Sequence, residues 1–252
     1  MDTNELKDFL EDKTARYQTP EFIETDPIQI PHLFNQAADI EVAGFLTATI
    51  SWGQRKSILT NAKKLMQLMG HAPADFVLHA NQKQLDHCSN FVHRTFNGTD
   101  LRVFLLALRD IYKQHASLGA LFEALFQQTG SVRESIIKWR ETFFLVPHQI
   151  RSQKHFANIL KNASAKRINM FLRWMVRPSA NKVDFGLWKK VPTSGLYIPL
   201  DLHTGNVARS LGLLTRKQND WKAVEELTSA LKTFDQQDPV KYDFALFGLG
   251  VF

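Results

Sequence analysis

The sequence predicts an all-α fold, and three observations lead to that prediction. Apolar residues recur at helical spacing along most of the 252 residues. No segment alternates apolar and polar residues over enough positions to demand a sheet. The composition, 44% hydrophobic and 22% charged residues, is typical of a globular protein that buries a core.

The first half of the chain predicts five helices. The first runs from Glu41 to Ile50 and is interrupted near Trp52. Asp100 is expected to cap the third, because a short acidic side chain accepts hydrogen bonds from the first backbone amides. The evidence for the second to fifth helices consists of the stripes Ile58, Ala62, Leu65 and Met69; Leu101, Phe104, Leu105, Leu108 and Ile111; Leu118, Leu121, Phe122 and Leu125; and the less regular residues 131–144.

The second half predicts four helices. The first has a core-facing stripe, is expected to be capped by Ser164 and ends at Pro178. Residues 178–199 have no clean period and contain prolines and glycines, which indicates an irregular connection with one short helix at most. The stripe of the first helix consists of Ile168, Phe171, Leu172 and Met175. The other three helices are expected around residues 207–213, 221–232 and 239–247. The last of them is expected to have Asp238 as its cap and Pro239 in its first turn.

The length of the chain allows one unit, residues 1–252, built from two helical lobes. We expect these lobes at approximately 30–150 and 151–252, with the middle of the chain as the hinge.

Basic residues outnumber acidic residues by 31 to 25, so the net charge is +6. Such an excess favours a polyanionic partner, because lysine and arginine displace condensed counterions from phosphates. The basic residues crowd into one segment, namely Lys161, Lys166, Arg167, Arg173, Arg177, Lys182, Lys189 and Lys190.

Metal, membrane and several enzyme classes are disfavoured. The sole cysteine, Cys88, cannot build a zinc ribbon or a Cys-ligated iron–sulfur cluster, and nine histidines show no ligand spacing. There is no Gly-rich phosphate loop, zinc-protease motif or nucleophile elbow. No apolar stretch is long enough for a bilayer, and the N-terminus is polar and acidic. We expect a cytoplasmic protein with no metal, no cofactor and no membrane partner.

Two segments carry a resemblance to a known superfamily. Residues 198–213 read Ile-Pro-Leu-Asp-Leu-His-Thr-Gly-Asn-Val-Ala-Arg-Ser-Leu-Gly-Leu, and residues 164–175 read Ser-Ala-Lys-Arg-Ile-Asn-Met-Phe-Leu-Arg-Trp-Met. The first resembles the helix around the catalytic aspartate of the helix-hairpin-helix base-excision DNA glycosylases, and Asp201 falls on that aspartate. The second resembles the archaeal 8-oxoguanine DNA glycosylase branch, whose catalytic lysine also opens an apolar helix. Lys166 falls on that lysine, thirty-five residues before Asp201.

Other segments bear on the same resemblance. Residues 238–250 resemble the closing helix of that branch, and residues 48–54 loosely resemble an early helix end that bears a glutamine. The Leu-Pro-Gly-Val-Gly hairpin that names the superfamily is absent, so its DNA-backbone anchor is in doubt. The chain also looks like a member of an uncharacterised bacterial family related to this branch, with similar Lys-Arg-x-Asn-x-Phe-x-Arg-Trp and Pro-Leu-Asp blocks.

The resemblance implies a glycosylase-like fold with an active-site cleft between the lobes, and DNA repair as the function. It implies double-stranded DNA with a damaged purine, such as 8-oxoguanine, as the substrate. Lys166 would displace the base, form a Schiff base with the opened deoxyribose and cleave the strand, so that the enzyme is also an AP lyase. Asp201 would stabilise positive charge on the sugar. A lysine nucleophile must be uncharged, and the first turn of a helix favours the neutral amine.

Five residues are candidates for contacts with nucleic acid: Trp52, Gln54, Arg167, Arg173 and Lys182. Base-processing enzymes stack an extruded base on aromatic side chains. Trp52 lies at a helix break beside Gln54, which has the groups to bind a base edge, whereas Trp174 and Trp188 are weaker candidates and Trp174 is expected in the core. Lys182 is also a rival nucleophile, although no long apolar helix follows it.

Simpler interpretations stay open beside these. Asp201 is also expected as a helix N-cap, and Lys166 as a solvated surface lysine. A non-catalytic nucleic-acid-binding module with the same fold is the alternative function, and a helical scaffold for a protein partner is a third.

Overall fold

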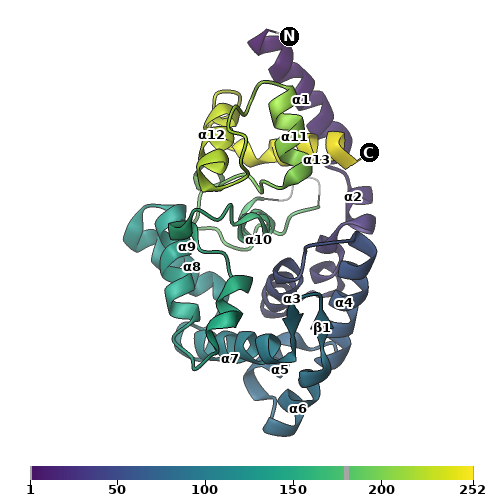
Figure 1. Ribbon diagram of the computed structural model, residues 1–252, viewed down its shortest axis with the longest axis vertical. Coiled ribbons are helices and arrows are strands. Elements are labelled where there is room, and N and C mark those ends of the chain that lie inside the picture. Colours follow the sequence, from purple (N-terminus) through teal and green to yellow (C-terminus); the bar gives the residue numbers. More distant parts are fainter. Residues whose placement is uncertain (1, 179–181, 252) are drawn as a thin grey trace. The chain divides into compact units, whose positions relative to one another are not determined.

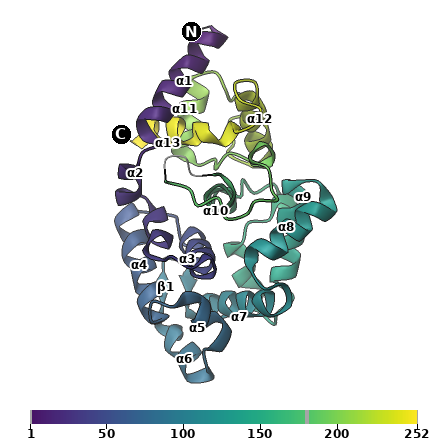
Figure 2. The same ribbon diagram turned by 180° about the vertical axis from the view of Figure 1, so that it is seen from behind.

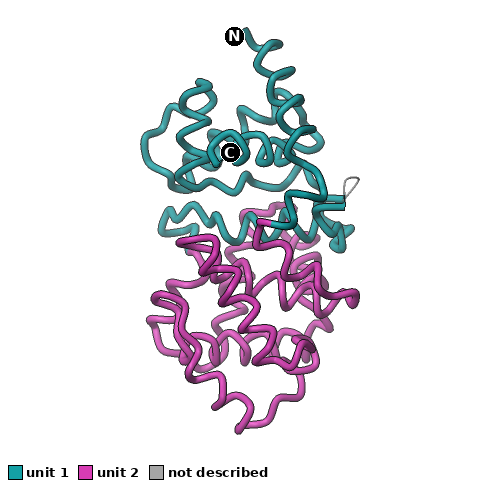
Figure 3. Tube along the Cα trace, turned by 90° about the vertical axis from the view of Figure 1, so that its right-hand side faces the viewer, with its two compact units in different colours: residues 1–24, 158–252 teal, residues 25–157 magenta. Residues whose placement is uncertain are grey.

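The computed structural model describes residues 2–178 and 182–251, and it is mostly helical, as the sequence predicts. The chain divides into two compact units (Figure 3). Unit 1 comprises residues 1–24 and 158–252, and unit 2 comprises residues 25–157. The N-terminal helix therefore belongs with the C-terminal part of the chain.

Unit 2 contains seven α-helices and one short hairpin among its described residues (Figure 1). Helix α3 is buried along most of its length, and α5 lies beside α7 (Figures 1 and 2). The elements are α3 (Ala37–Thr49), α4 (Arg55–Leu68), α5 (Pro73–His79), α6 (Gln82–His87), β1 (Val92–His93), β2 (Phe96–Asn97), α7 (Gly98–His115), α8 (Leu118–Thr129) and α9 (Val132–Phe143), with 3-10 turns η1 (Pro27–Gln29), η2 (Pro31–Leu33), η3 (Cys88–Asn90) and η4 (Ile150–His155).

An aromatic cluster forms the centre of unit 2. The Phe45 ring on α3 lies 6.0 Å from Phe104 and 5.4 Å from Trp139, measured between centroids. The buried Glu41 of the same helix accepts hydrogen bonds from the Tyr112 hydroxyl and from the backbone amides of Leu118 and Gly119. A buried carboxylate thus satisfies the first amides of α8, which would otherwise be costly to bury.

Unit 1 is built around the C-terminal helix, which packs against α1 and α11 (Figures 1 and 2). A side chain at Gly248 would overlap the Tyr17 ring, which a Cβ would meet at 2.3 Å. The elements are α1 (Thr3–Tyr17), α2 (Pro20–Thr25), α10 (Lys166–Val176), α11 (Leu202–Ser210), α12 (Trp221–Lys232) and α13 (Asp243–Val251), with 3-10 turns η5 (Ile159–Lys161), η6 (Thr193–Gly195) and η7 (Pro239–Tyr242).

Several helix boundaries differ from the prediction at their caps. Asn97, not Asp100, is the N-cap of α7, and Asp100 is the third helical residue that completes the capping box. Ala165, not Ser164, is the N-cap of α10, with φ 52°. Asp238 precedes η7 without a side-chain cap bond, although Pro239 does occupy the first turn. Cap identity depends on backbone geometry that helical periodicity does not report.

The irregular connection is confirmed from Lys182 onward. Within residues 182–199 the structure has one 3-10 turn, η6, and residues 179–181 lie outside the described part of the chain. Two backbone amides of this segment, those of Phe185 and Trp188, donate to the carbonyls of Trp174 and Met175 at 2.7 and 3.0 Å. The segment therefore satisfies the last carbonyls of α10.

Gly98 is expected to tolerate no side chain. A Cβ there would lie 2.1 Å from the backbone oxygen of Ser89 in η3, which cannot move as a flexible side chain would. We expect Gly98→Ala to lower the free energy of unfolding by about 3 kcal/mol, measured by urea denaturation. Thr99→Ala, at the exposed next position, is the control and should change it by less than about 0.5 kcal/mol. Equal stabilities for the two variants would contradict this packing.

Candidate functional site

Lys166 is the first residue of α10, at the edge of unit 1. The preceding segment turns sharply, because Asn162 and Ala165 both have left-handed backbone conformations, with φ 61° and 52°. The Ala165 carbonyl accepts hydrogen bonds from the amides of Ile168 and Asn169, which starts the helix. The positive end of the helix dipole therefore acts on the Lys166 amine.

Asp201 is the N-cap of α11, the next long helix of the unit. Its Oδ1 accepts a hydrogen bond from the Thr204 amide at 3.0 Å. Its backbone carbonyl accepts from the Gly205 amide at 2.9 Å and from the Asn219 side-chain amide at 2.8 Å. The carboxylate is thus held by the helix that it caps, and its second oxygen faces Lys166.

The two side chains meet across the starts of these helices. The Lys166 Nζ lies 3.9 Å from the Asp201 Oδ2, and the side chains are 24% and 25% exposed. The Nζ also donates to the Met170 Sδ at 3.6 Å, one turn along α10. This arrangement places an amine and a carboxylate side by side where solvent still reaches both.

A buried network of ion pairs lies on the same face of α10. Arg173 donates to Asp184 at 3.2 Å and to Asp243, the first residue of α13. Arg177 donates to Asp184 at 3.0 Å and to Asp238 at 2.7 Å. These pairs link α10 to the irregular segment and to the C-terminal helix, so the helix that carries Lys166 is held from several directions.

Asp243 connects this network electrostatically to the Lys166–Asp201 pair. Burial raises the pKa of its carboxyl to about 6. The positive charge of Arg173 opposes this rise, the negative charge of Asp201 adds to it, and that of Lys166 reduces it. The sequence did not identify Asp243 as a neighbour of this pair. The signal that could have identified it is an aspartate at the start of an apolar helix.

We expect Asp243 to give the stability a pH dependence. Its folded-state pKa, about 6, lies above the value of about 3.9 for an unfolded chain. Its contribution to the free energy of unfolding is therefore complete below about pH 4 and is lost as the pH rises through about 6. Asp243→Asn should remove this decline in urea denaturation across that range. Asp8→Asn, exposed on α1, should retain it, and retention by both variants would contradict the assignment.

The basic candidates have different environments. Arg167 is partly buried, and burial lowers the pKa of its guanidinium to about 10, so that an anionic neighbour would stabilise its charge. The prediction that Arg173 contacts nucleic acid is wrong, because its side chain is 4% exposed and already bound by two carboxylates. Lys182 is exposed with φ 58°, and its contact with nucleic acid stays a prediction.

Trp52 and Gln54 belong to unit 2. The Trp52 ring stacks on His155 at 5.8 Å between centroids and meets His93 edge-on at 5.0 Å. His155 in turn lies 3.2 Å from the buried Asp100 carboxylate. Trp52 is therefore held in one orientation by two histidines. Gln54 is an exposed N-cap residue of α4 without a side-chain cap bond.

The other tryptophans of the prediction lie in the core. Trp174 is fully buried, as expected, and Trp188 is 2% exposed and packs edge-on against Phe171. Neither ring has a face open for stacking on a base. Among the tryptophans considered from the sequence, Trp52 is the one with a partly exposed side chain.

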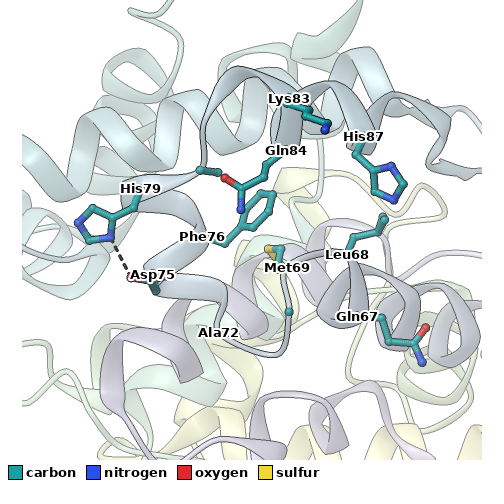
Figure 4. A pocket seen from close by; sticks show the side chains of 12 residues that line it. Gln67, Leu68, Met69, Ala72, Asp75, Phe76, His79, Lys83, Gln84 and His87 are labelled. Atoms are coloured by element: carbon teal, nitrogen blue, oxygen red, sulfur yellow. Dashed lines mark hydrogen bonds and ion pairs between the residues drawn. The ribbon is translucent and has the colours of Figure 1, made fainter.

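A groove in unit 2 contains none of these residues. It has a volume of about 590 Å³ and lies between the end of α4, α5 and α6 (Figure 4). Asp75 and His79 form an exposed pair at 2.9 Å beside it, and Met69 and Phe76 line its wall. The groove is therefore separate from the amine–carboxylate pair of unit 1.

Two features of the described residues bear on the disfavoured classes. Within residues 2–178 and 182–251, histidine, cysteine and acidic side chains form no group suited to a metal ion. No helix in the described part of the chain has the length and apolar character that a membrane span requires.

Comparison with known proteins places the chain in a family. A family model described as "Protein of unknown function (DUF2400)" matches residues 26–252. No curated protein and no solved structure matches the chain.

Proposed function

The chain belongs to the DUF2400 family, and we propose that it is a DNA glycosylase of base-excision repair with AP lyase activity. The proposed substrate is double-stranded DNA that carries a damaged purine such as 8-oxoguanine. The proposed fold is that of the helix-hairpin-helix glycosylases without the hairpin motif that names the superfamily. Lys166 is the proposed nucleophile, and Asp201 is its electrostatic partner.

One observation carries this proposal. Lys166 and Asp201, thirty-five residues apart in the sequence, have their Nζ and Oδ2 atoms 3.9 Å apart at the starts of two helices. Both side chains are about one quarter exposed, so a substrate can reach them. In the sequence these residues resemble a catalytic lysine and a catalytic aspartate, and their proximity supports the proposed roles.

The chemistry follows from the properties of an amine and a carboxylate. The lone pair of the neutral Lys166 amine forms a bond to C1′ of the deoxyribose while the bond from C1′ to the base nitrogen breaks. The base leaves with that electron pair and takes a proton. The Asp201 carboxylate stabilises the positive charge that develops on the sugar.

Strand cleavage then uses the same covalent bond. The attached amine loses a proton, the bond between C1′ and O4′ breaks, and O4′ takes a proton, which leaves a Schiff base between Nζ and C1′. Loss of a proton from C2′ expels the 3′ phosphate and cleaves the strand.

Borohydride trapping tests the proposal, because borohydride reduces a Schiff base to a stable amine. The protein is incubated with duplexes that contain 8-oxoguanine, uracil or an abasic site, and adducts are separated by denaturing gel electrophoresis. We expect an adduct on the abasic duplex and on the duplex with the preferred lesion. Binding to all duplexes without an adduct or base release would instead support the non-catalytic nucleic-acid-binding module.

A further inference from the structure

The connection between α11 and α12, residues 211–220, is tied to α11 by one arginine. Arg209 donates to the carbonyl oxygens of Arg216 and Lys217 at 2.9 and 3.0 Å, and to the Asn219 side-chain oxygen at 2.5 Å. We call residues 215–220 the basic loop. Because these two carbonyl oxygens are bound by Arg209, their partial negative charge is offset.

The basic loop is also bonded to Asp201 and to the segment that precedes Lys166. The Asn219 side-chain amide donates to the Asp201 carbonyl oxygen at 2.8 Å. Asp220 accepts a hydrogen bond from the Asn162 side chain at 2.8 Å, and the Trp221 amide donates to the Asn162 carbonyl at 3.2 Å. Asn162 lies four residues before Lys166, so the loop connects with the start of α10 and with the start of α11.

The acidic residues of this region are engaged in internal bonds. Hydrogen bonds from Arg216 hold the pKa of Asp220 well below its usual range. Hydrogen bonds from the hydroxyl and amide of Thr215, both at 2.6 Å, lower the pKa of Glu226. Both carboxylates are therefore charged, and each is satisfied by a neighbouring donor.

Two lysines have no such partner. Lys217 and Lys222 are exposed, and in the described part of the chain neither forms an ion pair with an acidic side chain. They line a surface groove of about 520 Å³ together with Arg216. Exposed ammonium groups beside a groove are the sites that phosphates occupy with release of counterions.

We propose that the basic loop, with Lys217 and Lys222, binds the phosphodiester backbone of the nucleic acid that Lys166 acts on. This inference rests on the proposed function and adds the means by which the backbone is held. The superfamily hairpin is missing from the sequence, and the loop carries cations on a segment whose Asn219 side chain is bonded to the Asp201 carbonyl oxygen. The occupant is a nucleic-acid backbone, because its repeated phosphates complement the two exposed lysines of this groove.

The test measures the binding of an undamaged duplex by fluorescence anisotropy over a series of salt concentrations. Lys217→Gln/Lys222→Gln is compared with Lys63→Gln/Lys64→Gln, which removes two exposed lysines from α4 and has the same net charge. We expect the loop variant to reduce the slope of log K against log salt by about 2, since each phosphate contact contributes about one. The control is expected to leave the slope unchanged.

Two outcomes would overturn the inference: an unchanged slope in the loop variant, or an equal loss in the control. The borohydride adduct of the wild-type protein separates these from failure of the proposed function. If the wild-type protein forms an adduct and the loop variant keeps the wild-type slope, the proposed role of the basic loop is wrong and the proposed glycosylase activity is supported. If the loop variant has a reduced slope and the wild-type protein forms no adduct, the basic loop binds the backbone and the proposed catalytic activity is wrong.

Discussion

We expect the largest effect from Lys166→Gln, which should form no borohydride adduct on an abasic duplex. Its rate of strand cleavage should fall by about 10³-fold or more. Glutamine has no amine lone pair with which to attack C1′, so the covalent route is lost while binding remains. The measurement is single-turnover cleavage of an end-labelled duplex at saturating protein, with adduct formation followed in parallel.

The control for Lys166 is the other candidate nucleophile. Lys182 is exposed and forms no ion pair with Asp201 in the described part of the chain, whereas the Lys166 Nζ lies 3.9 Å from the Asp201 Oδ2. Lys182→Gln is therefore expected to retain the adduct. The free energy of unfolding of Lys166→Gln, measured by thermal denaturation, should match that of the wild type within about 0.5 kcal/mol, because the Lys166 side chain is partly exposed. An adduct that persists in Lys166→Gln and disappears in Lys182→Gln would assign the nucleophile to Lys182.

Asp201→Asn should slow base release by about 10²- to 10³-fold, the range seen when one electrostatic stabiliser of a transition state is removed. Asparagine caps helices as well as aspartate does, so the bond to the Thr204 amide can remain while the negative charge is lost. The measurement is single-turnover base release with the lesion that gives the adduct.

Asp201→Ala separates capping from charge. This variant loses both, and we expect about 1 kcal/mol less stability than in Asp201→Asn, with base release slowed to a similar extent. If Asp201→Asn released the base at the wild-type rate, Asp201 would be a helix cap without an electrostatic role in the reaction.

The predicted helices could be read from the sequence because their signals are local. The apolar stripe of Ile168, Phe171, Leu172 and Met175 is buried in α10, and the range 221–232 coincides with α12. Pro178 and the glycines that follow it indicated correctly that no long helix continues there. The caps at Asn97 and Ala165 were missed, because neighbouring polar residues compete for a cap and backbone geometry decides between them.

The spatial neighbours of the charged residues could not be predicted from local sequence patterns. Arg173 was assigned to nucleic acid because it lies in a basic segment, but the structure pairs it with Asp184 and Asp243, eleven and seventy residues away. Likewise, the orientation of Trp52 depends on His93 and His155, which belong to other elements of unit 2. Charge crowding along a sequence does not distinguish an exposed cation from one that is already paired.

The sequence by itself determined that this protein is helical, where most of its helices lie, and that Lys166 and Asp201 each open one. These properties depend on residues within one or two turns of each other, so periodicity and capping preferences report them. Only the tertiary structure decided that the Lys166 amine and the Asp201 carboxylate meet, that Asp243 is buried near them, and that Asn219 joins the basic loop to Asp201. Such contacts arise when the apolar faces of separate helices pack together, and packing brings together polar residues whose separation in the sequence carries no signal.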